Sequence, residues 1–196
     1  MDQGKLKANE DLIERYQQGD HAAFDQLIKE HGTSLYNFIF YMTKSKSLAD
    51  DIYQETWSRV INHLDSYHEQ GKFKCWLFKI ANHQCLNHLR LVRRFFVPLT
   101  EILKTENEAD IFISESNFNS RPDEELESNE RLQWVRKLAH QLPIKQRQVF
   151  LLKMNSDLTF KEISVILNRP LNTVLTQMRT AMLTIRKKLK DIYGEL

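Results

Sequence analysis

The chain has 196 residues with ordinary proportions of hydrophobic (41%) and charged (28%) residues, so its composition is that of a globular protein. The net charge of +2 hides a strong asymmetry, because residues 1–95 carry +1, residues 96–130 carry −8 and residues 131–196 carry +9. The first ten residues are polar and no apolar run approaches the roughly 20 residues that cross a bilayer, which argues against an export signal and a membrane span.

Gly (5) and Pro (4) are scarce and apolar residues recur at helical spacing, so the predicted fold class is all-α. The charge pattern divides the chain into a disordered tail at residues 1–9, a helical domain at 10–95, a flexible acidic linker at 96–130 and a second helical domain at 131–196.

The first domain opens with a helix that Asp20 caps and that continues through an aromatic-rich stretch at 35–42. The next helix, at about 48–64, has one apolar face and one polar face. The polar face gathers Asp50, Asp51, Gln54, Glu55 and Ser58. Such an acidic stripe is usually solvated surface, but it also suits a partner helix that carries basic residues.

A long basic helix is predicted at about 73–95, after a turn at 65–71. Between Gln70 and Thr100 there are six Lys or Arg residues and no Asp or Glu, and three aromatic residues lie at the start of the helix. Rings that stack on bases, beside amines that hold phosphates, suit single-stranded DNA; a core role for Trp76 beside solubilising lysines is the alternative. The candidate DNA-binding residues are Lys72, Phe73, Lys74, Trp76, Lys79, Asn82, His83, Asn87, Arg90, Arg93 and Arg94.

The two cysteines, Cys75 and Cys85, fall on this predicted helix. Because they lie ten residues apart on one helix, they cannot share a metal ion, and His83 and His88 are not expected to complete a zinc site. Two cysteines without an export signal indicate the reducing cytoplasm and not a disulfide-linked secreted protein. No cofactor is expected.

In the second domain, helices are predicted at 131–142 and 144–154. A short amphipathic helix at 158–167, a turn at Asn168 and a long basic helix from Pro170 to about 189 then form a predicted helix-turn-helix. The second helix of this motif enters the major groove of duplex DNA. An αα-hairpin that touches no DNA is the alternative, and the net charge of +9 argues against it. The candidate residues for duplex DNA are Lys145, Arg147, Arg169, Pro170, Asn172, Thr173, Thr176, Gln177, Arg179 and Thr180.

Four stretches, in this order and spacing, resemble the extracytoplasmic-function (ECF) sigma factors, the small two-domain members of the sigma-70 family of bacterial RNA polymerase subunits. They are GDHAAF at 19–24, ADDIYQETW at 49–57, FKCWLFKIA at 73–81 continued by CLNHLR at 85–90, and LPIKQR at 142–147 followed by the helix-turn-helix. The resemblance covers nearly all of residues 19–189.

The resemblance implies a transcription initiation factor, not an enzyme, that binds core RNA polymerase and directs it to promoters. The acidic stripe would bind the clamp coiled coil of the largest polymerase subunit. The basic helix would hold the melted minus-ten element, the loop at 65–72 would capture a flipped base, and the last domain would read the minus-thirty-five element as duplex. The acidic linker would pass through the cationic interior of the polymerase.

The resemblance also implies an anti-sigma factor of the membrane-bound kind, which would insert between the two domains and mask the acidic stripe. No small-molecule substrate is expected. Four positions depart from the family: His83 stands where Asn is common, Asn87 where an acid is common, and Leu175 and Gln177 where basic residues are common. The loss of two basic contacts predicts minus-thirty-five binding that is weaker or of unusual sequence.

Two other functions fit part of the chain. A response-regulator output domain shares the helix-turn-helix but leaves residues 20–95 unexplained. A sigma-like interaction protein that sequesters a partner without initiating transcription would fit the depleted recognition helix. An enzyme fits least, because no Gly-rich phosphate loop, nucleophile elbow or zinc-ligand spacing is present in the sequence.

Overall fold

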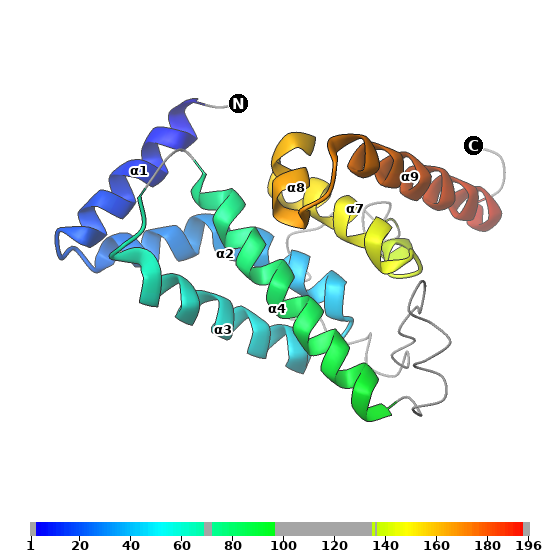
Figure 1. The fold of residues 1–196 in the computed structure, drawn as a ribbon, viewed down its shortest axis with the longest axis horizontal. Helices are drawn as coiled ribbons and strands as arrows, with labels where there is room; N and C mark the ends of the chain where they lie inside the picture. The colour runs from blue at the N-terminus through cyan, green and yellow to red at the C-terminus, as the bar shows by residue number, and fades with distance from the viewer. Residues whose placement is uncertain (1–2, 69–71, 97–134, 136, 194–196) are drawn as a thin grey trace.

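The computed structural model describes residues 3–68, 72–96, 135 and 137–193, and within these ranges every regular element is a helix, as the all-α prediction requires. The first group comprises α1 (Gln3–Gln17), α2 (Ala22–Thr43), α3 (Lys46–Leu64) and α4 (Phe73–Phe96). The second comprises α7 (Ile144–Ser156), α8 (Phe160–Leu167) and α9 (Leu171–Tyr193) (Figure 1). Residues 97–130 of the predicted acidic linker, and residues 131–134 and 136 of the predicted helix at 131–142, lie outside the described residues.

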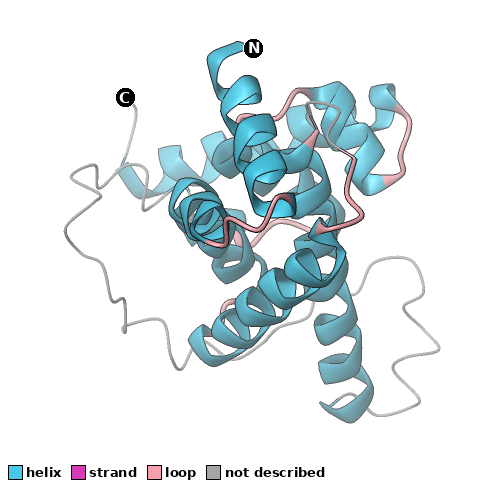
Figure 2. Ribbon diagram, turned by 90° about the vertical axis from the view of Figure 1, so that its left-hand side faces the viewer, coloured by secondary structure: helices cyan, strands magenta, loops and turns pink. Residues whose placement is uncertain are grey.

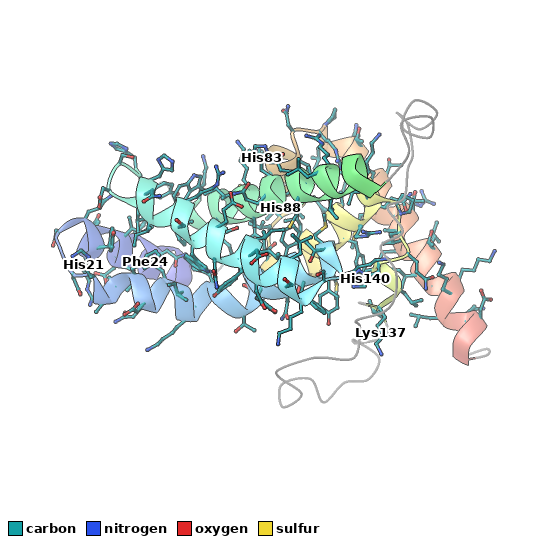
Figure 3. All side chains as sticks on the ribbon, turned by 90° about the horizontal axis from the view of Figure 1, so that it is seen from below. His21, Phe24, His83, His88, Lys137 and His140 are labelled. Carbon is teal, nitrogen blue, oxygen red and sulfur yellow. The ribbon has the colours of Figure 1, made fainter. Side chains whose placement is uncertain are left out.

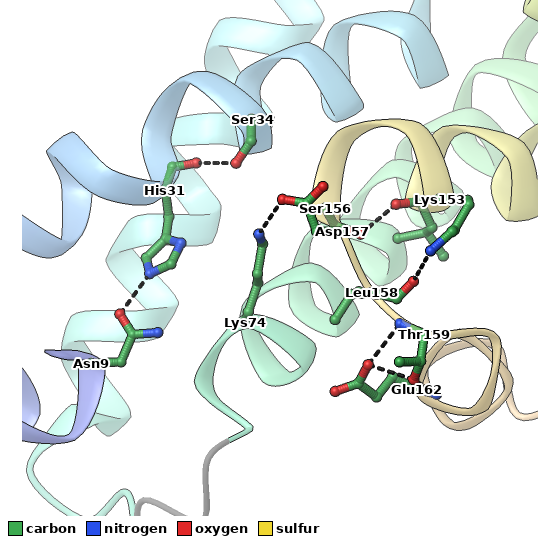
Figure 4. A network of polar contacts seen from close by, with 11 residues as sticks. Asn9, His31, Ser34, Lys74, Lys153, Ser156, Asp157, Leu158, Thr159 and Glu162 are labelled. Carbon is green, nitrogen blue, oxygen red and sulfur yellow. Dashed lines mark hydrogen bonds and ion pairs between the residues drawn. The ribbon is translucent and has the colours of Figure 1, made fainter. Parts of the chain in front are cut away.

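The start of the chain differs from the disordered tail predicted at residues 1–9, because α1 begins at Gln3. Tertiary contacts hold this polar helix: Leu12, Ile13 and Tyr16 are buried. Asn9 is also buried, and its Oδ1 lies 2.9 Å from His31 Nε2 on α2 (Figure 4). This contact gives the buried amide oxygen a hydrogen-bond partner and helps to fix the register of α1 on α2.

The core of the first group forms where α2, α3 and α4 pack together. Helix α2 ends at Thr43, because the next residue, Lys44, has a left-handed backbone (φ 61°). The Ser45 side chain then caps α3 by accepting from Leu48 N at 3.3 Å. Gly32 permits the close approach of α2 to α3, because a Cβ there would lie 2.6 Å from the Tyr53 hydroxyl.

The second group contains the predicted helix-turn-helix. Thr159 and Glu162 form a capping box at the start of α8, and Asn168 ends α8 in the left-handed conformation (φ 50°) that its predicted turn role requires. On α9, Val174, Ala181 and Ile185 recur at helical spacing and are buried, so they form the inner face of the helix.

The two groups of helices pack directly on one another. Helix α2 contacts α7, and α4 contacts both α7 and α8. Figure 2 shows the same packing from the side, with the helices of both groups gathered into one body. At one edge of this interface the rings of Tyr41 and His140 lie 5.5 Å apart. The DNA-binding surfaces predicted on α4 and on the helix-turn-helix therefore belong to neighbouring helices.

The buried His140 should make stability fall in mild acid. Burial, together with the smaller effects of the charges on Lys44 and Arg147, lowers the pKa of His140 to about 3. The unfolded chain, with an ordinary pKa near 6.5, then binds more protons than the native state, so the stabilisation present at neutral pH is lost as pH falls from about 6.5 toward 3. At pH 5 the loss is about 2 kcal/mol.

Urea unfolding of the wild type and of His140→Gln at pH 7.5 and pH 5 measures this loss. Between the two pH values, the free energy of unfolding of the wild type should fall by about 2 kcal/mol more than that of the variant. Equal losses in the two proteins would show that His140 titrates normally in the native state.

Candidate nucleic-acid interface

The polar face of α3 is exposed, as predicted, and two of its carboxylates are held by neighbouring helices. Asp51, Gln54 and Ser58 are exposed, whereas Asp50 and Glu55 are half-buried. The Tyr36 hydroxyl on α2 donates to Asp50 Oδ1 at 2.7 Å. These contacts fix the orientation of the carboxylates, so the acidic face is preorganised for a partner.

Glu55 connects α3 to α4. Its Oε1 accepts from Arg59 Nη2 at 3.0 Å, and its Oε2 lies 3.2 Å from Nε2 of His88 on α4. Partial burial raises the pKa of Glu55, but the hydrogen bonds from His88 and Arg59 outweigh burial, so the pKa lies below its ordinary value. Figure 3 shows His88 and His83 on the same helix, α4. The acidic face and the predicted DNA-binding helix are therefore joined by a direct side-chain contact.

A cavity of about 710 Å³ lies beside α4 and contains the aromatic and cationic groups expected to bind a nucleobase and phosphate. Tyr67 and Trp76 stack against each other with ring centroids 4.5 Å apart and 25° between planes. Arg59, Lys79 and His83 also line the cavity, and no described residue in its lining is Asp or Glu. Planar rings beside positive charge can stack a base and neutralise its phosphate.

Most of the other candidates on α4 lie at its surface. Lys72, Lys79, His83 and Arg90 are exposed, and Lys74, Trp76 and Asn87 are half-buried. The side chains of Arg93 and Arg94 lie outside the described part of the structure.

Three predicted DNA-binding residues are buried, which corrects the exposed positions expected for them. Phe73 is 1% exposed because its ring packs against His31, Tyr67 and Trp76. Asn82 is 6% exposed because it pairs across the interface with α7. Arg147 is 5% exposed, and its Nη2 donates to the backbone oxygens of His140 and Leu142 at 2.6 and 3.0 Å. Arg147 therefore ties the start of α7 to the preceding segment and is not placed to bind a phosphate in this arrangement.

The outer face of α9 presents the side chains predicted to contact duplex DNA. The hydroxyls of Thr176 and Thr180 donate to backbone oxygens one turn earlier, at 2.9 and 3.0 Å. Gln177 is half-buried, and its Oε1 accepts from Arg169 Nη1 at 3.0 Å. Exposed candidates on and around α9 are Lys145, Pro170, Asn172, Thr173, Thr176, Arg179 and Thr180.

The cavity also includes residues that the sequence analysis did not single out. Arg59, His63, Tyr67 and His68 come from the end of α3 and the turn that follows it. The resemblance to sigma factors implied that the loop at 65–72 captures a flipped base, but it did not single out these side chains. Their convergence on Trp76 depends on the packing of α3 against α4, which no local pattern reveals.

Comparisons with known proteins agree with this arrangement. The sigma-70 region 2 family matches residues 27–95, and the sigma-70 region 4 family matches residues 132–185. The chain is 27% identical over 180 residues to the ECF sigma factor SigW of Bacillus subtilis, covering 92% of this chain and 96% of SigW. It is 25% identical over 189 residues to the sigma-H factor of Pseudomonas aeruginosa, covering 95% and 96% of the two chains. This chain belongs to the ECF class of the sigma-70 family.

Two solved structures share the fold of this sigma factor. The sigma factor RpoE of Bartonella quintana, in complex with the anti-sigma factor NepR, has a TM-score of 0.68 at 21% identity, covering 85% of this chain and 96% of RpoE. CnrH, in complex with the cytosolic domain of CnrY, has a TM-score of 0.65 at 19% identity, covering 94% and 98% of the two chains. These likenesses support the predicted two-domain helical architecture.

As a sigma factor, the protein acts with core RNA polymerase and promoter DNA in promoter-directed transcription initiation. Its family consists of transcription initiation factors and not of classical enzymes. Among the described residues of this sigma factor, no helix has the length and apolar character needed to cross a membrane.

Proposed function

We propose that the two helical groups of this sigma factor engage one promoter at two places while the acidic face of α3 binds core polymerase. Residues 10–95 would bind the polymerase and the melted minus-ten element, and residues 131–196 would bind the minus-thirty-five element as duplex. The linker at 96–130 would connect them through the polymerase interior. The residues proposed to bind the polymerase and the two promoter elements are the candidates predicted from the sequence, except that Phe73 and Arg147 have supporting structural roles.

The observation that carries the minus-ten assignment is the cavity beside α4. A flipped base loses a few kcal/mol of stacking when it leaves the duplex, and a new stacking partner offsets that loss. The Tyr67–Trp76 pair lies at the cavity wall with Lys79 beside it. An aromatic platform next to a cation suits one base and its phosphate, which supports capture of a melted-strand nucleotide here.

Replacing Trp76 with Ala should weaken promoter opening without preventing assembly with the polymerase. Loss of one base-stacking ring costs about 1–3 kcal/mol, which is roughly 5- to 150-fold in affinity for the melted strand. Binding of the holoenzyme to a labelled minus-ten single strand, and permanganate reactivity of promoter thymines, measure the effect.

Trp76→Phe is the matched control, because it keeps a ring at the same position and should retain most of the affinity. Co-purification with core polymerase should be equal for all three proteins, since Trp76 lies off the acidic face. Full strand affinity in Trp76→Ala would refute the assignment of this cavity to base capture.

The exposed face of α9 supports the minus-thirty-five assignment and the weaker or unusual binding predicted for it. The face offers threonine methyl groups that can contact thymine methyls, and Gln177, which can pair with adenine. This face has fewer basic residues than is common in the family, so contacts with DNA phosphates contribute less to its sequence-independent binding.

An anti-sigma factor is the proposed regulatory partner, with the acidic face of α3 among the surfaces it would mask. Support comes from RpoE of Bartonella quintana, whose solved structure contains the anti-sigma factor NepR. The preorganised carboxylates of Asp50 and Glu55 would suit a basic inhibitor helix as well as the polymerase.

A further inference from the structure

Three of the seven histidines in the chain line the cavity beside α4 that is proposed to capture a base. His63 lies in the last turn of α3, His68 in the turn that follows and His83 on α4, and all three residues are exposed. The other four histidines lie elsewhere, and their contacts are Tyr16 with His21, Asn9 with His31, Glu55 with His88 and Tyr41 with His140. The histidines are therefore concentrated where the strand is proposed to bind.

The hydrogen bond of His68 determines which of its ring nitrogens can meet a ligand. Its Nδ1 lies 2.9 Å from the backbone oxygen of Ser66, and a carbonyl oxygen can only accept, so Nδ1 carries a hydrogen. In the neutral ring Nε2 is then an acceptor, which repels the oxygen of a phosphate. In the protonated ring Nε2 also carries a hydrogen and can donate to that oxygen. His68 can therefore bind a phosphate only after its ring has taken up a proton.

The other side chains around the cavity add positive charge or no charge. Arg59 on α3 and Lys79 on α4 supply positive charge at neutral pH, and the two lining residues from α8, Ile166 and Leu167, are apolar. Within the part of the chain that the structure describes, the lining contains no Asp or Glu. A protonated imidazole in this wall has no carboxylate beside it in the lining.

The carboxylates on the surrounding elements lie outside the lining. Helix α4 has no Asp or Glu in its sequence. On α3, Glu55 pairs with Arg59 and with His88, and Asp65 follows the helix as an exposed residue. On α8, Glu162 is engaged in the capping box. A protonated imidazole in the cavity therefore obtains its counter-charge most directly from a bound anion.

We propose that these three histidines form a phosphate site that binds the melted minus-ten strand in its protonated state, so that strand capture takes up protons and becomes tighter as pH falls. Histidine side chains change charge between about pH 5 and 8. The Arg and Lys side chains attract the strand throughout this range, whereas the histidines add attraction toward its acidic end. A strand phosphate is favoured over a free anion because the Tyr67–Trp76 stack offers a base surface in the same cavity. This inference rests on the proposed capture of a base here.

Binding of the holoenzyme to a labelled minus-ten single strand at pH 8 and at pH 6, at constant ionic strength, tests the proposal. Because the protonated rings are the binding form, the wild type should bind more tightly at pH 6, by roughly 5- to 20-fold for charge-assisted hydrogen bonds at an exposed site. The double variant His68→Gln/His83→Asn keeps polar side chains but cannot take up these protons. Its gain should fall to about 2-fold, the contribution left to His63.

His21→Gln is the matched control and should keep the wild-type gain. His21 is exposed, its ring packs edge-on against Tyr16 with centroids 5.6 Å apart, and Figure 3 shows it well away from His83. Circular dichroism at both pH values establishes that all the proteins keep their helices. Equal wild-type affinities at the two pH values, or an undiminished gain in the double variant, would overturn the proposal.

A second measurement needs neither polymerase nor promoter. The NMR signals of the imidazole rings are followed in the full-length protein from pH 5 to pH 8, with and without inorganic sulfate, an anion whose charge is constant over this range. Because the proposed site binds an anion in its protonated form, sulfate should raise the titration midpoints of His63, His68 and His83. The midpoint of His21 should not move. Unchanged midpoints at all three cavity histidines would overturn the site.

The two measurements together distinguish the sources of the anion. Raised midpoints combined with a strand affinity that does not depend on pH would mean that the site takes a free anion and not the strand, contrary to the proposal. A holoenzyme that binds no minus-ten strand at either pH would instead refute the proposed function, and the NMR titration alone would then decide whether the histidines bind an anion.

Discussion

Replacing Asp51 and Glu55 together with Lys should weaken the binding of this sigma factor to core RNA polymerase by roughly 10- to 100-fold and abolish promoter-dependent transcripts. Asp51 is exposed on the polar face of α3, and Glu55 is held on that face by Arg59 and His88. Reversing both charges changes the face by four units of charge, so a basic partner would be repelled where it is now attracted. Co-purification and a binding titration with core enzyme measure the loss.

Glu55→Lys also places a cation beside Arg59 and His88, so part of its effect could come from a shifted α4. Asp51→Lys alone separates the two causes, because this exposed side chain can change sign without entering the α3–α4 contact. Glu30→Lys, an exposed charge reversal on α2, is the control and should bind core enzyme like the wild type. Unchanged core binding in the double variant would refute the assignment of this face.

Replacing Phe78 with Ala should destabilise the first helical group by about 3–5 kcal/mol. The Phe78 side chain is fully buried, and its ring meets Phe38 of α2 with centroids 5.5 Å apart and 62° between planes. Truncation removes this edge contact and leaves a cavity behind the helix that carries the proposed minus-ten surface. Promoter binding should fall with stability, because α4 would no longer be held in place.

Urea unfolding, monitored by circular dichroism, measures this loss of stability. Leu183→Ala is the control, because this side chain on α9 is 59% exposed and its removal should change stability by less than about 0.5 kcal/mol. A loss below about 1 kcal/mol in Phe78→Ala would mean that the core collapses around the missing ring, contrary to the packing described.

The sequence predicted the helices and their faces because those features follow local rules. The buried face of α9 follows from helical spacing, and the end of α8 follows from an Asn in the left-handed conformation before a Pro. The acidic face of α3 was likewise predicted, with Asp51 and Gln54 exposed.

The features that the sequence did not predict depend on contacts between distant segments. Helix α1 is polar and weakly periodic, and it is held through contacts such as Asn9 with His31. Asn82 was among the predicted DNA-binding residues of α4, but it is buried and pairs with Gln148 of α7. Phe73 was grouped with DNA-binding rings by its position beside lysines, and the packing of His31 and Tyr67 places it in the core instead.

The contact between His88 and Glu55 limits how a sigma factor of this kind can change its promoter specificity during evolution. One helix, α4, carries the groups proposed to select the promoter and also the imidazole that orients a carboxylate proposed for the polymerase. A substitution that rotates or shifts α4 to accept a new promoter base will also move His88 away from Glu55. We therefore expect new target genes to be acquired most readily through changes on α9 and in the turn after α3, which leave the proposed contact with the polymerase intact.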